Sequence, residues 1–208
     1  MTGSKEERVV AVGTLLSQSG ALVAMADLID YRFNEVVEAI ENARGYATSL
    51  VVFTGVGKSG LVGQYLASCF KAIGIQSVFL HPTDAVHGDM GILRGAGVLI
   101  ALSNSGETKE IAPIIDFMDY LEKPVYLVTA GGDKCSLALS VENVLPLARL
   151  PEMDPSGLLP LKASLMQMAL GNALVVAVAK KIGFSRGALA RRHPGGAIGE
   201  KLREEGAG

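Results

Sequence analysis

Two short apolar runs, at residues 50–54 and 97–102, each lead into a turn rich in glycine or serine and then into apolar residues at helical spacing. A run of this kind, bounded by small and polar residues, is typical of a buried strand that ends in a turn. Comparable runs fall at 76–80, 124–129 and 143–146. Strands that alternate with helices in this way form a parallel sheet with right-handed crossovers and helices on both faces.

Helical spacing of apolar residues recurs along the rest of the chain. The segments with this spacing are 5–45, 59–73, 107–121, 134–140 and 161–181. Gly45 is expected to end the first of them. The stretch 146–160 contains four prolines and is predicted to be irregular, and the tail 184–202 is predicted to be too rich in glycine for a regular helix.

These elements predict one domain that spans residues 1–208. The helical segment 1–48 precedes the α/β core 49–183. The tail 184–208 follows the core and is expected to contribute to the functional site. Five parallel strands commonly take the doubly wound, flavodoxin-like order 2-1-3-4-5. We therefore expect an α/β fold, a three-layer αβα sandwich, with a ligand crevice where the loops after the first and third strands meet.

The turn after the third predicted strand, residues 103–108, has the sequence S-N-S-G-E-T. A helix N-terminus offers free N–H groups and positive dipole character to an anion, and Ser and Thr hydroxyls add donors without bulk. A helix cap needs only one hydroxyl, whereas this turn supplies those of Ser103, Ser105 and Thr108. The pattern favours a binding site for a phosphate ester over a simple cap.

The turn after the first predicted strand, residues 55–60, matches G-x-G-x-x-G and raises the possibility of a dinucleotide site. That fingerprint also needs an acidic residue about 20 positions further on, at the end of the next strand, where this chain has His81. A P-loop is excluded as well, because its first glycine would fall on Val52. Lys58 within a glycine turn is better suited to a small phosphorylated or carbonyl ligand, so no nicotinamide cofactor is expected.

Composition narrows the class of protein further. A hydrophobic fraction of 49% with 25 glycines fits a buried parallel sheet. The formal charge of −2 gives no basic footprint, which argues against nucleic acid as a partner. A mean hydropathy of +0.35 suggests that apolar surface is buried between subunits.

The compartment is predicted from what the chain lacks and from its cysteines. No uninterrupted apolar run reaches the ~18–20 residues of a membrane helix, and the N-terminus lacks the apolar core of a signal peptide, so no membrane association is expected. Cys69 and Cys135 lack metal-type spacing and are interpreted as reduced thiols of a cytoplasmic protein.

Four segments together resemble the sugar isomerase (SIS) domain family and, within it, the arabinose 5-phosphate isomerases. They are Gly55–Gly60, the H-P-x-x-A-x-H-G-D segment His81–Asp89, Ser103–Glu107 and the H-P-G-G-A-x-G segment His193–Gly199. The serine turn marks any SIS domain that binds a sugar phosphate. The two histidine-containing segments are narrower and point to the arabinose 5-phosphate subgroup.

The resemblance implies interconversion of an aldose phosphate and a ketose phosphate through an enediol, without a cofactor or metal. By this resemblance, the catalytic residues are Lys58, Glu110, Glu152 and His193. The phosphate-binding residues are Ser59, Ser103, Ser105 and Thr108, and the other substrate-binding residues are Gly57 and His87. Glu152 is the expected proton-transfer base, and its alternative is a solvated loop acid. His193 is expected to open the sugar ring or relay a proton in a neighbouring subunit of a homotetramer.

Three alternatives stay open at this stage. His81, His87 and Asp89 have a spacing that metal ligands could share, although structural hydrogen bonding is the favoured interpretation. Residues 161–165 have one hydroxyl where the family has a hydroxyl-rich stretch, which leaves room for another substrate, such as a hexulose 6-phosphate. SIS domains also serve as non-catalytic sugar-phosphate sensors. Many relatives continue into a pair of cystathionine-β-synthase-type modules, which are not expected in this sequence.

Overall fold

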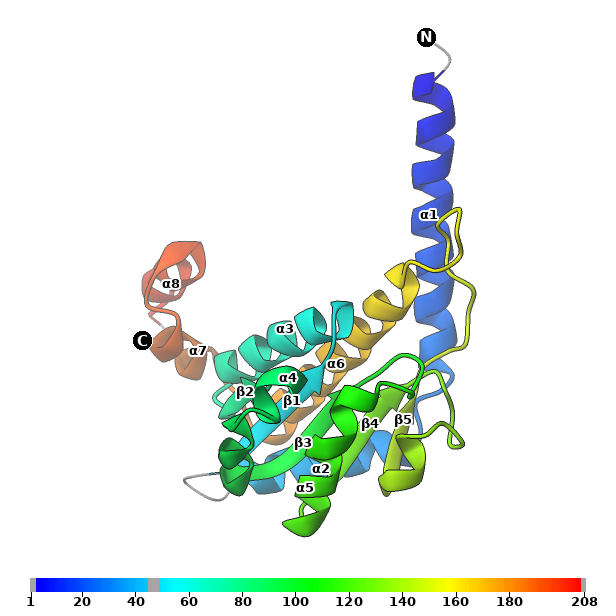
Figure 1. Ribbon diagram of the computed structural model, residues 1–208. Helices are drawn as coiled ribbons and strands as arrows, with labels where there is room; N and C mark the ends of the chain where they lie inside the picture. Colours follow the sequence, from blue (N-terminus) through cyan, green and yellow to red (C-terminus); the bar gives the residue numbers. More distant parts are fainter. Residues whose placement is uncertain (1–2, 45–48, 207–208) are drawn as a thin grey trace.

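A five-stranded parallel sheet forms the centre of the computed structural model, which describes residues 3–44 and 49–206 (Figure 1). The strands are β1 (Leu50–Gly55), β2 (Ser77–Phe79), β3 (Ala96–Leu102), β4 (Val125–Thr129) and β5 (Asn143–Pro146). Their order is β2-β1-β3-β4-β5, and every neighbouring pair is parallel. The structure therefore confirms the predicted sheet and its order.

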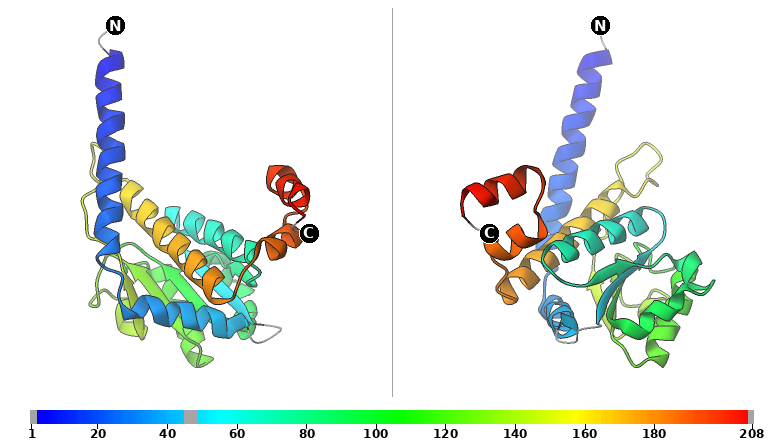
Figure 2. Two further views of the ribbon diagram at one scale, coloured as in Figure 1. Left: turned by 180° about the vertical axis from the view of Figure 1, so that it is seen from behind. Right: turned by 90° about the vertical axis from the view of Figure 1, so that its left-hand side faces the viewer.

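Helices cover both faces of the sheet (Figures 1 and 2). The helices are α1 (Gly3–Ala26), α2 (Tyr31–Arg44), α3 (Lys58–Ala72), α4 (Pro82–Ala85), α5 (Ala112–Tyr120), α6 (Leu161–Lys181), α7 (Arg186–Arg192) and α8 (Gly196–Glu204), with 3₁₀ turns η1 (Asp89–Gly95), η2 (Lys109–Ile111) and η3 (Ala138–Ser140). Helices α2, α3 and α6 belong to the core on one face, and α5 to the core on the other. The three-layer αβα sandwich is confirmed.

The two cores follow from the alternation of side chains along each strand. In β3, Val98 and Ile100 pack into the core that contains α2, α3 and α6, whereas Leu99 and Ala101 pack into the core that contains α5. All four side chains are almost completely buried. Both faces are covered, so the strand is a continuous apolar run, as expected for a parallel sheet.

The helical segment predicted at 5–45 is two helices rather than one. The chain turns between α1 and α2, and the Asp30 carboxylate accepts a hydrogen bond from the backbone N–H of Arg32 (3.0 Å) while pairing with its guanidinium. An acidic residue at this position caps the first turn of a helix. Apolar spacing continues across the turn, which is why periodicity alone missed the break. Gly45, the predicted stop, lies outside the described residues.

Two other predicted helices are shorter in the structure, and the prediction for the tail is wrong. The segment 107–121 contains η2 followed by α5, and 134–140 contains only η3. The tail forms α7 and α8, which are separated at Gly195 and Gly196, where Gly196 has φ 68°, while Gly187 and Gly199 lie inside the two helices. Ser185 caps α7 by accepting a hydrogen bond from Ala188 N–H (3.2 Å).

The expectation of no membrane-length segment is corrected in part. By length and composition, the helices Lys5–Ala26 and Leu161–Lys181 could each cross a membrane. Uncharged polar residues interrupt their apolar runs without adding charge, so a search for unbroken runs overlooks them. Helix α6 is a core helix, with Leu174 and Val178 almost fully buried. Most of α1, by contrast, extends beyond the body of the protein (Figure 1).

The glycine turn after β1 allows α3 to begin directly against the sheet. Gly57 has φ 59° and ψ −127°, a conformation open essentially to glycine alone. Gly60 faces the end of the strand so closely that an added Cβ would lie 2.8 Å from the Gly55 carbonyl oxygen. The G-x-G-x-x-G pattern therefore has a packing role in this fold.

Gly60→Ala is expected to lower the free energy of unfolding by about 1–3 kcal/mol, because the clash between the new methyl group and the Gly55 carbonyl oxygen can be relieved only by moving α3. Gly20→Ala is the matched control, since Gly20 lies in exposed α1 with no atom near its missing Cβ. The control is expected to gain up to about 1 kcal/mol from helix propensity. Urea unfolding measures both, and an unchanged midpoint for Gly60→Ala would contradict this packing role.

Candidate functional site

The serine turn after β3 uses two of its three hydroxyls internally. Ser103 is buried, and its Oγ lies 2.7 Å from Thr108 Oγ1 and accepts a hydrogen bond from Gly106 N–H at 3.1 Å. Ser105 is exposed, and its Oγ accepts from Glu107 N–H at 3.2 Å. The hydroxyls of Ser103 and Thr108 therefore stabilise the turn, and Ser105 is the one that faces outward.

The loop after β4 supports the serine turn from beside it. The Glu107 carboxylate accepts hydrogen bonds from the Ser136 hydroxyl and backbone N–H, and these bonds hold the pKa of Glu107 below its usual range. Leu137 N–H donates to the Gly106 carbonyl at 3.0 Å. Gly106 has φ 72°, and an added Cβ would overlap the Cys135 sulfur. The turn is thus fixed by close packing as well as by hydrogen bonds.

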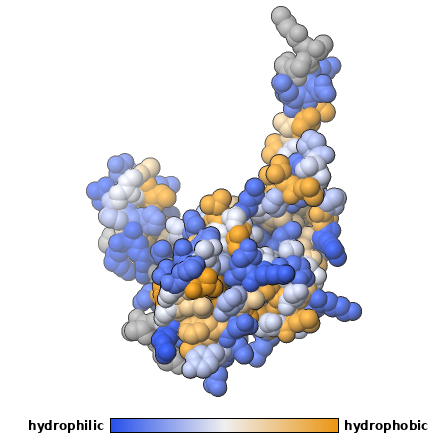
Figure 3. Space-filling model, viewed as in Figure 1, coloured by the Kyte–Doolittle hydropathy of each residue, from blue (hydrophilic) through white to orange (hydrophobic). Residues whose placement is uncertain are grey.

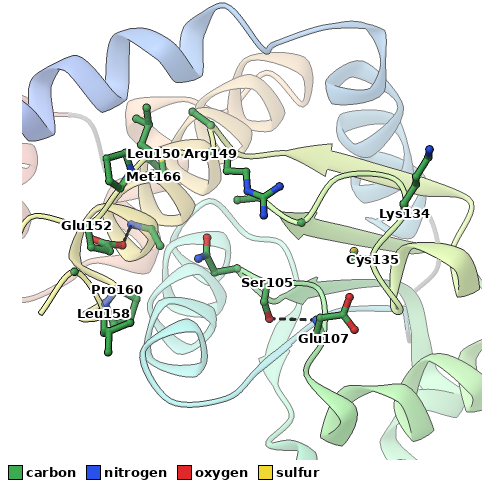
Figure 4. Close-up of a pocket in the computed structure, with 17 residues that line it drawn as sticks. Ser105, Glu107, Lys134, Cys135, Arg149, Leu150, Glu152, Leu158, Pro160 and Met166 are labelled. Atoms are coloured by element: carbon green, nitrogen blue, oxygen red, sulfur yellow. Dashed lines mark hydrogen bonds between the residues drawn. The ribbon is translucent and has the colours of Figure 1, made fainter.

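A cleft of about 610 Å³ opens beside this turn at the carboxyl ends of β3, β4 and β5 (Figure 4). Its polar lining includes Asn104, Ser105, Lys134, Arg149 and Glu152, and the first turns of α6 close one side. Ligands of open parallel sheets bind outside the carboxyl ends of the strands. The cleft occupies that edge, but it lies towards β4 and β5 rather than between β1 and β3 as predicted.

Glu152 is held at the N-terminus of α6. Its Oε2 accepts hydrogen bonds from the backbone N–H groups of Leu161 (3.0 Å) and Lys162 (2.8 Å), and its Oε1 accepts from that of Ala163 (3.0 Å). Pro160 stands at the cap position and offers no capping side chain, so Glu152 satisfies N–H groups that would lack partners. The side chain of Glu152 is therefore fixed in orientation and forms part of the cleft wall.

The predicted residues of the glycine turn lie on the other side of the serine turn from the cleft. Strand pairing places Gly55 opposite Leu102, so Gly57, Lys58 and Ser59 follow β1 beside the start of the serine turn. Gly57 and Lys58 are exposed, and Ser59 is half-buried. None of these three lines the cleft in a single chain.

The other predicted residues near the sheet edge are also outside the cleft. Glu110 is exposed in η2, and His87 is exposed between α4 and η1. His81 Nδ1 accepts a hydrogen bond from Thr83 N–H (3.2 Å) at the start of α4. Among the described residues, no three His, Cys, Asp or Glu side chains are grouped so that they could hold a metal ion. The hydrogen bond to Thr83 gives His81 a structural role, whereas the interpretation of His87 and Asp89 stays a prediction.

His193 lies far from Glu152 in the same chain. Helix α6 has 21 residues, so at about 1.5 Å per residue it is roughly 30 Å long. Glu152 caps its N-terminus, whereas His193 ends α7 beyond its C-terminus (Figure 2). His193 Nδ1 is buried without a hydrogen-bond partner in the described part of the chain. One chain alone does not bring these two predicted catalytic residues together.

The cleft residues that were not predicted from the sequence include three polar ones, Asn104, Lys134 and Arg149. Figure 4 shows Arg149 and Ser105 near the middle of the opening, with Glu152 and Lys134 on either side. The side-chain oxygen of Asn104 is buried without a partner among the described residues. Their positions just after β3, β4 and β5 are the signal that could have found them, because loops at that edge form the ligand site.

Residues 47–177 match the SIS domain family, so the chain belongs to that family. It is 37% identical over 181 residues to the arabinose 5-phosphate isomerase KdsD of Salmonella typhimurium. The aligned residues make up 87% of this chain and 54% of that protein. The chain thus spans about half the length of the curated relatives that it matches.

Solved structures share this fold, among them the two that follow. An Escherichia coli CFT073 protein in complex with arabinose 5-phosphate is 26% identical, with a TM-score of 0.77 over 91% of this chain and 98% of that chain. A putative sugar-phosphate isomerase from Listeria monocytogenes has a TM-score of 0.85 and 24% identity, covering 92% and 98% of the two chains. The second similarity concerns the fold alone.

Ser103→Ala and Ser105→Ala are expected to differ in their effect on stability. Removing the buried Ser103 hydroxyl leaves Thr108 and Gly106 each without one hydrogen bond, which costs about 1–2 kcal/mol of unfolding free energy. Ser105→Ala removes an exposed contact and is expected to change that energy by less than about 0.5 kcal/mol. Urea unfolding of both variants tests this, and equal losses would contradict the division of roles.

Proposed function

We propose that this chain is a sugar-phosphate aldose–ketose isomerase, and that its substrate pair is D-arabinose 5-phosphate and D-ribulose 5-phosphate. The observation that carries the proposal is the carboxylate of Glu152, fixed by three backbone N–H groups in the wall of the cleft that Ser105 also lines. This isomerisation needs an oriented base near two adjacent carbons and a separate group that holds the phosphate. The cleft offers both.

Glu152 is the proposed proton-transfer base. A carboxylate has about four lone-pair sites, and the three hydrogen bonds to α6 occupy two on Oε2 and one on Oε1. Oε1 therefore keeps a site for a substrate proton. It would take the proton from the carbon next to the carbonyl, form the enediol, and return the proton to the neighbouring carbon.

The phosphate is proposed to bind at the serine turn. Ser105 supplies a donor, and Arg149 and Lys134 line the same cleft without an ion pair or hydrogen bond to any described residue. Their charges suit a phosphate dianion. The cleft also contains Glu107, whose carboxylate is held in place by hydrogen bonds from Ser136.

A second copy of the chain is proposed to complete the site. His193 is a helix length away from Glu152 in its own chain and has an unpartnered ring nitrogen, so it can serve Glu152 only in another subunit. Lys58, Ser59 and Glu110, which lie outside the cleft of one chain, are proposed to face the same assembled site. In it, His193 would open the sugar ring or relay the hydroxyl proton, Lys58 would stabilise the developing oxyanion, and Glu110 would orient the sugar.

Helix α1 offers a surface for that assembly. Figure 3 shows apolar side chains along it, and Val10, Leu15 and Leu16 are 63%, 66% and 68% exposed. Exposed apolar area of this extent marks an interaction surface. We propose that a second copy covers it within a homotetramer in the cytoplasm, where sugar phosphates are made.

Two alternative functions are compatible with this fold and are distinguished from the proposed one by experiment. The first is an isomerase for another sugar phosphate, such as a hexulose 6-phosphate, because the start of α6 lacks the hydroxyl-rich stretch of the arabinose 5-phosphate isomerases. The second is a sensor without catalysis. A sensor needs the phosphate turn but has no use for an unpaired His193, which is why the enzyme is preferred.

The purified chain is expected to interconvert pentose 5-phosphates faster than hexose phosphates, and to leave unphosphorylated sugars unchanged. Glu152→Gln preserves the shape of the side chain and can still accept at α6, but it lacks basicity, so kcat should fall by roughly 100-fold or more. Proton NMR of a sugar-phosphate panel in D₂O follows both turnover and deuterium incorporation beside the carbonyl.

The matched control is Glu142→Gln, an exposed acid before β5 at the opposite edge of the sheet, which should retain full activity. Binding of ribulose 5-phosphate by Glu152→Gln, measured by calorimetry, separates loss of the base from loss of the site. Normal turnover by Glu152→Gln would exclude Glu152 as the base. Binding without turnover by the native chain across the panel would instead identify a sensor.

Two inactive variants, Glu152→Gln and His193→Ala, are expected to regain part of their activity when their subunits are mixed. Mixed assemblies contain some sites with both native residues, whereas a site within one chain can never regain them. The control mixes Glu152→Gln with the double variant, which supplies no native Glu152 and should stay inactive. Exchange is verified by native mass spectrometry, and an exchanged mixture without recovered activity would refute the shared site.

A further inference from the structure

Lys162 is a buried cation behind the cleft that the proposed mechanism does not use. It lies in the first turn of α6 and is only 7% exposed. No carboxylate in the described part of the chain lies within ion-pair distance of it. Burial of an ammonium group is costly unless its protons are bound, so its one hydrogen-bonding partner is informative.

That partner is the residue before Glu152. Lys162 Nζ donates to the Pro151 carbonyl oxygen at 2.8 Å. The backbone N–H of Lys162 donates to Glu152 Oε2, also at 2.8 Å. Lys162 therefore donates hydrogen bonds to two consecutive residues of the loop, to Pro151 from Nζ and to Glu152 from its backbone N–H.

The loop between β5 and α6 has few other attachments near Glu152. Leu147 N–H donates to the Thr129 carbonyl at 2.7 Å where the loop begins. Beyond Glu152, the Asp154 carboxylate accepts from the N–H groups of Ser156 and Leu159, which are in the loop itself. Among the described residues, every hydrogen bond that ties 149–153 to the rest of the chain comes from the first turn of α6.

Without the Nζ contact, the peptide before Glu152 would be free to rotate, and the carboxylate would depend on its own three hydrogen bonds for its position. A side chain with three rotatable bonds is oriented less firmly when its backbone moves. A displacement of about 1 Å at a reacting group can lower a rate by roughly 100-fold. The contact from Lys162 fixes that backbone.

We infer that Lys162 is a positioning residue, which clamps the Pro151–Glu152 segment to α6 and so holds the Glu152 carboxylate in the cleft. The inference rests on the proposed function of Glu152 for its effect on turnover, but the clamp itself does not. Lys162 does not line the cleft, so it acts through Glu152 and not on the substrate.

Lys162→Met keeps an unbranched side chain of nearly the same length and fits an apolar setting, but it cannot donate to Pro151. It is expected to lower kcat by about 10-fold or more while KM changes less than about twofold, because the phosphate contacts are untouched. Amide hydrogen exchange of residues 161–163 should become faster, since their partner Glu152 is held less firmly. Lys162→Arg restores a donor and should recover most of both properties.

Lys180→Met is the matched control, because Lys180 is exposed in the last turn of the same helix and should change neither readout. Native exchange at residues 161–163 in Lys162→Met would overturn the inference, and so would native kcat despite faster exchange. If the native chain isomerises no sugar phosphate, the proposed function fails. The exchange comparison between Lys162→Met, Lys162→Arg and Lys180→Met then decides by itself whether the clamp exists.

Discussion

The seating of the Glu152 carboxylate on the N-terminus of α6 is the interaction on which the site depends. A helix leaves its first N–H groups without internal partners, and here they are satisfied from a loop eight residues before the cap position. This contact joins the β5 loop to the longest helix of the core layer formed by α2, α3 and α6. It thereby forms one wall of the cleft and sets the direction in which the carboxylate can act.

The opposite wall of the cleft, the serine turn, is also fixed by hydrogen bonds. The serine turn is rigid because Ser103 and Thr108 satisfy each other inside it, and because Glu107 joins it to Ser136 in the neighbouring loop. Parallel strand pairing places both walls at one edge of the sheet. Rigid loops on a rigid sheet are what the proposed reaction, which moves a proton between two neighbouring carbons, requires.

The sheet and α6 were predictable because short apolar runs between glycine and serine turns, and long apolar periodicity, are local signals. The break at Asp30 and the two tail helices were not, because each depends on a single cap or on where glycines fall relative to a junction. Of the residues predicted to form the site, Ser105 and Glu152 line the cleft. Sequence could not separate Ser105 from Ser103, since only the packed turn decides which hydroxyl faces inward. Arg149 was not predicted, although its place just after β5 is a signal that could have found it.

The capping contact also changes how the presence of a glutamate at this position can be interpreted. Glu152 stabilises α6 whether or not any sugar is turned over, and the loss of such a cap costs about 1 kcal/mol. A chain of this architecture that had lost catalysis would still be under pressure to retain an acceptor here. His193 Nδ1, by contrast, has no hydrogen-bond partner in the described part of its own chain. Under the proposed function, it is therefore the histidine, rather than the glutamate, whose presence would distinguish an enzyme from a binding module.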